Sequence, residues 1–132
     1  MAAGKEEPTL AEFLAPGVEP QDLPELFPLL AARKLLSAFT ALFHGGEEAV
    51  MARLLVLREI GARGEAPQWT PAELGARFAY VDQVKLDTIL RRLKDHNLLV
   101  WDADRRTYQL SSPGRMALTA IEHLLGFSGE ED

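Results

Sequence analysis

The sequence predicts a mainly α-helical domain with one small β-hairpin. Apolar residues recur at the spacing of a helix through most of the 132 residues. Only two short runs, residues 98–102 and 107–111, have the apolar, β-branched and aromatic residues typical of strands. A hydrophobic content of 47% with 26% charged residues is that of a globular chain that can bury a core.

One main domain is expected over residues 22–127, between two tails. Residues 1–21 begin with small and acidic residues and then become rich in proline and glycine, which is typical of a flexible segment. Residues 128–132 include the acidic end "GEED", which predicts a solvated tail.

The first helix is predicted over residues 22–44. Asp22 can cap its start, with Glu25 at the third helical position, and the pair Gly45-Gly46 can end it. This helix carries more large apolar side chains than a buried stripe of somewhat over 100° can hold. They are Leu26, Leu29, Leu30, Leu35, Leu36, Phe39, Leu42 and Phe43.

The excess of apolar residues on this helix has two explanations. Either the domain covers the helix on both sides, or a second chain covers one side. Because soluble monomers rarely expose a large apolar patch, we expect a homodimer. The predicted interface residues are Leu29, Leu36, Phe39, Leu42 and Phe43.

Three further helices are predicted before the hairpin, over residues 47–61, 70–79 and 82–96. The second has a strong start, because Thr70 can cap it and Glu73 can close a capping box. Asp82 can cap the third, which buries a stripe at positions i, i+3, i+4 and i+7. The residues of that stripe are Leu86, Ile89, Leu90 and Leu93.

The last of these helices leads directly into the hairpin. Asn97 suits the left-handed backbone position after a helix, and "ADRR" joins the two strands. Of the neighbours Val100 and Trp101, one should face the core and the other solvent. A final helix is expected to start at Ser112 and Pro113. It is predicted to pack through Ala117, Ile121, Leu124 and Leu125.

The order helix, short helix, helix and hairpin resembles the winged helix-turn-helix over residues 47–111. A short run near Gln68 and Trp69 would supply the third strand of such a fold. The segment "LRRLKDHNLLVWDADRRTYQLSSPGR" is similar to the helix-to-wing segment of many bacterial winged-helix proteins. The resemblance implies a winged helix-turn-helix with extra N- and C-terminal helices.

Two families share this arrangement. One comprises the multiple-antibiotic-resistance-type dimeric regulators, in which the third helix enters the major groove and the wing touches the DNA backbone or minor groove. The other is the N-terminal winged-helix domain of MukF-like bacterial condensin kleisins. It is similar in its long apolar helix before the winged helix and in "LSSPGR" after the wing.

The two resemblances imply different functions. The first implies transcription regulation through double-stranded DNA. The second implies a role in chromosome condensation, chiefly as a surface for dimerisation and for binding another protein subunit. The chain departs from both patterns, because it is shorter than a full kleisin and its third helix is less basic than that of a typical regulator. We expect DNA binding, with a protein–protein assembly module as the alternative.

If the predicted helix over residues 82–96 reads DNA, its outward face and the tip of the hairpin supply the contacts. Arginine suits this work, because its planar fork can hold guanine or phosphate through two hydrogen bonds. The predicted DNA-binding residues are Lys85, Thr88, Arg91, Arg92, Arg105 and Arg106. Alternatively these are ordinary solvated charges, since four aspartates lie among them. Val84 on the same face suits a thymine methyl group or a protein partner equally well.

The net charge of −6 argues against a general binder of polyanions, because such binding depends on neutralising phosphates. Residues 70–116 differ from the rest of the chain, with eight basic and six acidic side chains. That segment contains all six of the predicted DNA contacts.

No catalytic residue, cofactor or metal site is expected. The chain has no cysteine, its three histidines are scattered, and no glycine-rich phosphate loop with a lysine is present. The N-terminus lacks the apolar run of a signal peptide, and no stretch of about 18 apolar residues occurs. We therefore expect a cytoplasmic protein that is not an enzyme and does not contact a membrane.

Overall fold

The computed structural model describes residues 8–63 and 68–131, with side chains up to residue 126. The chain divides into two compact units, residues 1–33 and residues 34–132. The composition of the sequence predicts this boundary after residue 21 instead. Residues 1–33 form the N-terminal unit, and residues 34–132 form the main unit.

The N-terminal unit consists of short helical turns. Its elements are η2 (Leu10–Phe13), η3 (Pro20–Asp22), η4 (Pro24–Leu26) and α1 (Phe27–Ala31). The prediction of one continuous helix over residues 22–44 is therefore wrong. Asp22 ends a 3₁₀ turn instead of capping a helix. Proline has no N–H to donate, and Pro24 and Pro28 each stand in the first turn of a separate element.

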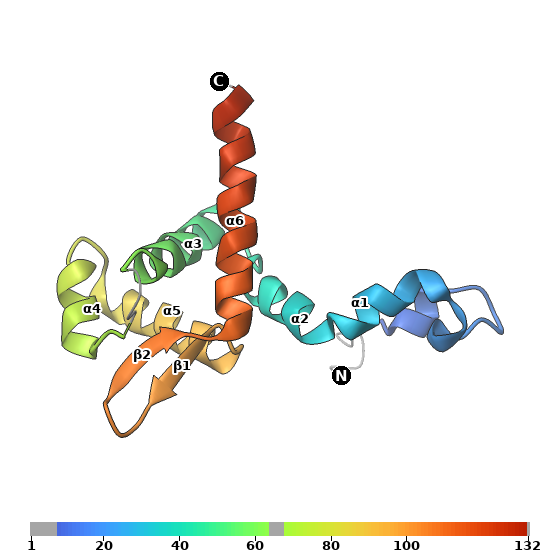
Figure 1. The fold of residues 1–132 in the computed structure, drawn as a ribbon, viewed down its shortest axis with the longest axis horizontal. Helices are drawn as coiled ribbons and strands as arrows, with labels where there is room; N and C mark the ends of the chain where they lie inside the picture. Colours follow the sequence, from blue (N-terminus) through green and yellow to red (C-terminus); the bar gives the residue numbers. More distant parts are fainter. Residues whose placement is uncertain (1–7, 64–67, 132) are drawn as a thin grey trace, which may run out of the picture. The chain divides into compact units, whose positions relative to one another are not determined.

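The main unit contains five helices and one hairpin among its described residues, which confirms the predicted class of mainly α with a small β-hairpin (Figure 1). The helices are α2 (Arg33–Leu42), α3 (Glu47–Gly61), α4 (Pro71–Arg77), α5 (Gln83–Asp95) and α6 (Ser112–Glu131), and the strands are β1 (Leu99–Asp102) and β2 (Thr107–Leu110). From α3 to β2, the order is the one that a winged helix-turn-helix requires.

The predicted helix signals are present in the main unit. The Thr70 hydroxyl accepts a hydrogen bond from the Glu73 amide, and the Glu73 carboxylate accepts one from the Thr70 amide, which completes the capping box of α4. Asp82 caps α5 by accepting from the Lys85 amide at 3.0 Å. Asn97 follows α5 with a φ of 67°, the left-handed conformation expected of it.

The hairpin pairs its strands in antiparallel register, with Leu99 opposite Leu110 and Trp101 opposite Tyr108. The third strand expected near Gln68 and Trp69 is reduced to a single bridge between Trp69 and Tyr108. Two backbone hydrogen bonds form that bridge, at 2.9 and 2.8 Å. The hairpin is thereby tied to the loop that precedes α4.

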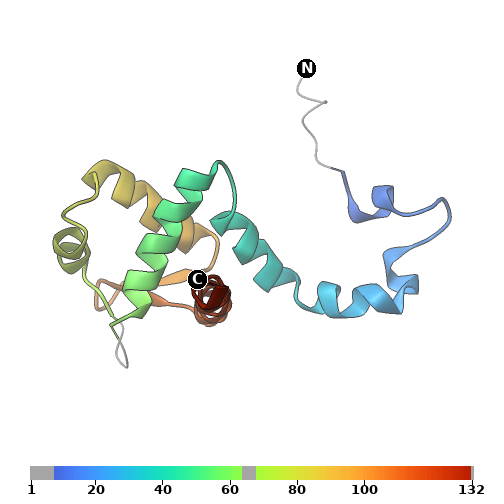
Figure 2. The same ribbon diagram turned by 90° about the horizontal axis from the view of Figure 1, so that it is seen from above.

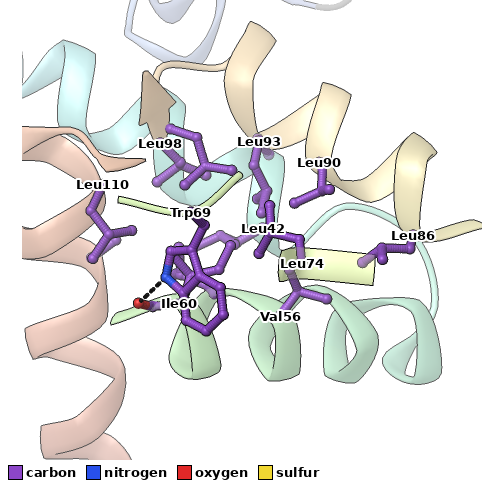
Figure 3. Close-up of a cluster of buried hydrophobic side chains, with 14 of the residues drawn as sticks. Leu42, Val56, Ile60, Trp69, Leu74, Leu86, Leu90, Leu93, Leu98 and Leu110 are labelled. Carbon is purple, nitrogen blue, oxygen red and sulfur yellow. Dashed lines mark hydrogen bonds between the residues drawn. The ribbon is translucent and has the colours of Figure 1, made fainter. Parts of the chain in front are cut away.

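The core of the main unit lies between α3, α4, α5 and the hairpin (Figure 3). Leu57, Leu74 and Leu93 are fully buried in it. Trp69 is also buried, and its indole N–H donates to the Ile60 carbonyl at 3.1 Å. Arg63 stacks over the indole, with its guanidinium carbon 3.6 Å from the ring centroid. Trp69 is therefore a core residue whose polar N–H has a partner.

The final helix, α6, packs beside α3 and continues past it (Figures 1 and 2). Ala117 and Ile121 are buried as predicted, whereas Leu124 and Leu125 are 59% and 41% exposed. The prediction that these two leucines pack inward is wrong, because the last turns of α6 extend beyond the elements that it contacts. The helix continues to Glu131, so its backbone includes most of the predicted acidic tail.

Candidate binding face

The outward side of α5 is the candidate binding face suggested by the sequence. Leu86, Leu90 and Leu93 are buried and attach the helix to the core, with Ile89 partly buried beside them. The predicted apolar stripe is therefore confirmed, and it leaves the opposite side in solvent. Val84 is 76% exposed, the largest exposed fraction among the exposed large hydrophobic residues. An apolar side chain thus stands unprotected in the first turn of α5.

Arg91 lies on this outward side and forms an ion pair within the same helix. Its guanidinium is 2.6 Å from the Asp87 carboxylate, four residues earlier. The two side chains are 64% and 65% exposed. An exposed pair of this kind contributes only about 0–1 kcal/mol, so Arg91 can exchange Asp87 for another anion at little cost.

The helical spacing predicts that Arg92 points to solvent, and this prediction is wrong. Arg92 is partly buried, and its Nε donates to the Ala41 carbonyl at 3.0 Å. That carbonyl belongs to the last turn of α2, where backbone oxygens have no partner within the helix. The position of a residue around the helix axis does not fix where a long side chain ends. Arg92 lies at the edge of the outward side, and its guanidinium turns back to the end of α2.

Arg53 of α3 binds the same end of α2, and sequence reasoning did not identify it. Its guanidinium donates to the carbonyls of Leu42 and His44. Partial burial and then the nearby charge of Arg92 lower the pKa of Arg53. No carboxylate of the described residues forms an ion pair with Arg53 or Arg92. Two neighbouring cations therefore lack a counter-ion in the described structure.

A groove of about 430 Å³ separates α3 from α5. The α3 side is formed by Ala49 and Ala52, whose small side chains leave the space open. Arg53 is the third lining residue from α3. The lining residues from α5 are Val84, Lys85, Thr88, Ile89 and Arg92. The groove therefore combines apolar walls with three cationic side chains. It contains three of the predicted DNA-binding residues, Lys85, Thr88 and Arg92.

The hydroxyl of Thr88 is engaged within α5, where it donates to the Val84 carbonyl at 3.2 Å. The side chain of Lys85 is exposed, and no hydrogen bond or ion pair involves it among the described residues. Of the predicted residues on α5, Lys85 is therefore the one that is immediately available to a ligand.

The tip of the hairpin holds Arg105 and Arg106. Asp102 organises this turn, because one of its carboxylate oxygens accepts from the amides of Asp104 and Arg105. Arg106 has a φ of 56° and donates its amide to the Asp102 carbonyl at 2.7 Å. Both arginines are exposed, and the Arg105 guanidinium reaches the Gln68 side chain at 3.4 Å.

The aromatic pair of the hairpin lies near α5. The rings of Trp101 and Tyr108 are 4.8 Å apart, and the pKa of Tyr108 is raised by burial and by the charge of Asp87. Trp101 is 37% exposed and Val100 is 44% exposed. The expectation that one of these two neighbours faces the core is therefore wrong, because the short sheet extends past the core at this end.

The predicted dimer residues are divided between the two units and differ in exposure. Leu29 belongs to the N-terminal unit, and Leu42 is fully buried in the core of the main unit. Leu42 is therefore excluded as an interface residue. Phe39 is partly buried and stacks on Phe43 with ring centroids 6.2 Å apart. Leu36 and Phe43 remain exposed, at 43% and 45%.

No group of three or more potential metal ligands occurs among the described residues. In the same part of the chain, no helix has both the length and the apolarity needed to span a bilayer.

Comparison with known proteins gave no match to a family model, to a curated protein or to a solved structure. The comparisons therefore identify no winged-helix family for this chain.

Proposed function

We propose that this chain is a winged-helix assembly module. Helix α5, the third helix of the winged-helix segment, binds a protein partner. The observation that supports this proposal is the exposure of Val84 beside a groove with apolar walls. Exposed apolar residues beside a concave surface favour a protein partner, because burying them on binding gains hydrophobic free energy.

The charges of the α5 face also support a protein partner. Arg91 forms an ion pair with Asp87 within α5, and Arg92 donates a hydrogen bond to a backbone carbonyl of α2. Asp87 and Asp95 place negative charge on the same helix. Affinity for DNA depends on cations that neutralise phosphates, and this face holds few that are free to do so.

DNA binding is the second candidate, and it would make the chain a dimeric regulator or a chromosome-associated protein. Lys85 and Arg106 favour it, because both side chains are exposed and neither has a hydrogen bond or ion pair among the described residues. Arg91 could join them by leaving its weak pair with Asp87. Thr88 and Arg105 would then complete the contact set.

A salt titration of binding to duplex DNA separates the two candidates. Under the assembly proposal, the full chain binds a mixed-sequence duplex weakly at low salt and shows no preference among sequences. A protein that makes about six phosphate contacts would instead lose roughly a thousandfold in affinity between 50 and 200 mM salt. Tight binding with such a salt dependence, weakened by Arg91→Ala, would establish the DNA candidate and overturn the assembly proposal.

A further inference from the structure

We infer that the α3–α5 groove of one copy of this chain takes the acidic N-terminal segment, residues 8–33, of a second copy. This inference rests on the proposed assembly function and names the partner. The contact depends on the chemistry of two surfaces on different copies and requires no particular arrangement of the two units in one chain.

The groove is suited to a peptide that is both apolar and acidic. Val84 and Ile89 provide branched apolar side chains, and Ala49 and Ala52 leave room opposite them. The volume of about 430 Å³ is within the range of about 300–1,000 Å³ that ligand pockets occupy. A few side chains of a peptide can therefore enter it.

The cations of the groove favour an anionic occupant. Arg53 and Arg92 lie close enough that the charge of Arg92 contributes to lowering the pKa of Arg53. Lys85 adds a third positive charge on the same lining. A carboxylate placed here would relieve the repulsion between the two arginines, and partial burial would strengthen the attraction by lowering the local dielectric constant.

The N-terminal segment has the complementary chemistry. Residues 8–33 contain four acidic side chains and one basic side chain, a net charge of −3. None of these residues is buried in the structure. Phe13, Phe27 and Leu29 are 72%, 50% and 52% exposed. A segment that has apolar side chains but no core gains most from a groove that can bury them.

The experiment measures binding of a fluorescein-labelled peptide with the sequence of residues 8–33 to the full chain by fluorescence anisotropy. We expect saturable binding at 50 mM salt that weakens at 500 mM. Val84→Asp and Lys85→Glu should each weaken binding at least about tenfold, by removing an apolar contact or reversing a charge. Both side chains are exposed, so neither change should disturb folding. Met116→Asp, at a 57% exposed methionine of α6, is the matched control and should leave binding unchanged.

A second measurement tests whether the contact forms between copies. The full chain with Val84→Asp retains an intact segment, and the full chain with Asp22→Lys and Glu25→Lys retains an intact groove. We expect a mixture of the two to form heterodimers, detected by energy transfer between labels, whereas the Val84→Asp chain mixed with differently labelled Val84→Asp should give no segment-dependent signal.

The inference and the proposed function fail in different ways. Absence of peptide binding, or binding that Val84→Asp and Lys85→Glu leave unchanged, overturns the inference. The assembly function would survive that result provided that the DNA titration shows only weak, sequence-indifferent binding. Conversely, steeply salt-dependent DNA binding overturns the assembly function whatever the peptide does.

Discussion

Arginine side chains in this protein have roles that their positions in the sequence do not reveal. Arg91 and Arg92 are adjacent, yet one forms an exposed pair with Asp87 and the other donates to the Ala41 carbonyl. A difference of about 100° around the helix directs the second side chain toward the end of α2. Of two neighbouring arginines, one therefore lies on the exposed surface, and the other connects two helices of the fold.

The difference between these arginines predicts different effects on stability. Arg92→Ala should lower the free energy of unfolding by about 1–3 kcal/mol, because it leaves the carbonyl of the buried residue Ala41 without its charged donor. Arg91→Ala is the control and should change it by less than about 1 kcal/mol. Urea denaturation followed by circular dichroism measures both. Equal effects of the two substitutions would contradict the structural role assigned to Arg92.

The two tryptophans are also expected to contribute differently to stability. Trp69→Phe should cost about 1–3 kcal/mol of stability, because the buried Ile60 carbonyl loses the indole N–H that donates to it. Trp101→Phe changes a side chain that is 37% exposed and should cost less than about 1 kcal/mol. Chemical denaturation measures the free energy of unfolding of both variants. A larger decrease for Trp101→Phe than for Trp69→Phe would show that the hairpin aromatic pair is the more important contact.

The connection between the hairpin and α6 depends on a close approach of two backbones. The Ser111 hydroxyl donates to the Asn97 carbonyl and accepts from the Gly114 amide at 2.9 Å. A Cβ atom at Gly114 would lie 2.2 Å from the Leu98 carbonyl oxygen, which is backbone and cannot turn aside. Glycine in "SSPGR" is therefore required by packing, although alanine is the better helix former.

Two glycines of α6 test this account against helix propensity. Gly114→Ala should destabilise the protein by about 1–3 kcal/mol, since the clash forces the backbone apart. Gly126→Ala has no atom within 4 Å of the new Cβ and should be neutral or stabilise by up to about 1 kcal/mol. Thermal and urea unfolding provide the comparison. A stabilising Gly114→Ala would mean that α6 can move away from Leu98 without loss.

Several apolar side chains of the main unit are exposed to solvent. Phe43 and Met51 line a hollow of about 500 Å³ formed by the α2–α3 loop and the first turns of α3, and Leu124 and Leu125 are exposed on α6. A homodimer remains a proposal that would cover some of this surface. It can no longer include Leu42, which is buried inside its own chain.

Light scattering on the full chain tests the dimer. We expect a dimer for the unaltered chain. Phe43→Glu, combined with Val84→Asp so that the α3–α5 groove no longer holds a second copy, should shift the mass toward monomer, because the Phe43 ring is 45% exposed and its replacement should not unfold the core. Met116→Glu, on an exposed site of α6, is the control and should leave the mass unchanged. Leu42→Glu would not be informative, since burying a carboxylate in the core would unfold the protein. A monomeric unaltered chain at all concentrations would refute the dimer.

The sequence by itself determined the local elements of the main unit. The capping box of α4, the Asp82 cap of α5, the left-handed Asn97 and the hairpin were all predicted, because each depends on residues within a few positions of one another. The bounds of α3 were predicted at the same residues for the same reason. Apolar periodicity also identified Leu86, Leu90 and Leu93 as core residues.

Only the tertiary structure decided which surfaces are free. The end of α2 draws in Arg53 and Arg92 because its carbonyls need donors, and no local pattern reveals how far those side chains lie from that end. The same is true of Leu42, whose burial depends on packing in a core formed by distant segments, and of Leu124, which is exposed because α6 extends past its neighbours. Periodicity predicts which side of a helix is apolar, whereas contacts between segments far apart in the chain decide what covers it.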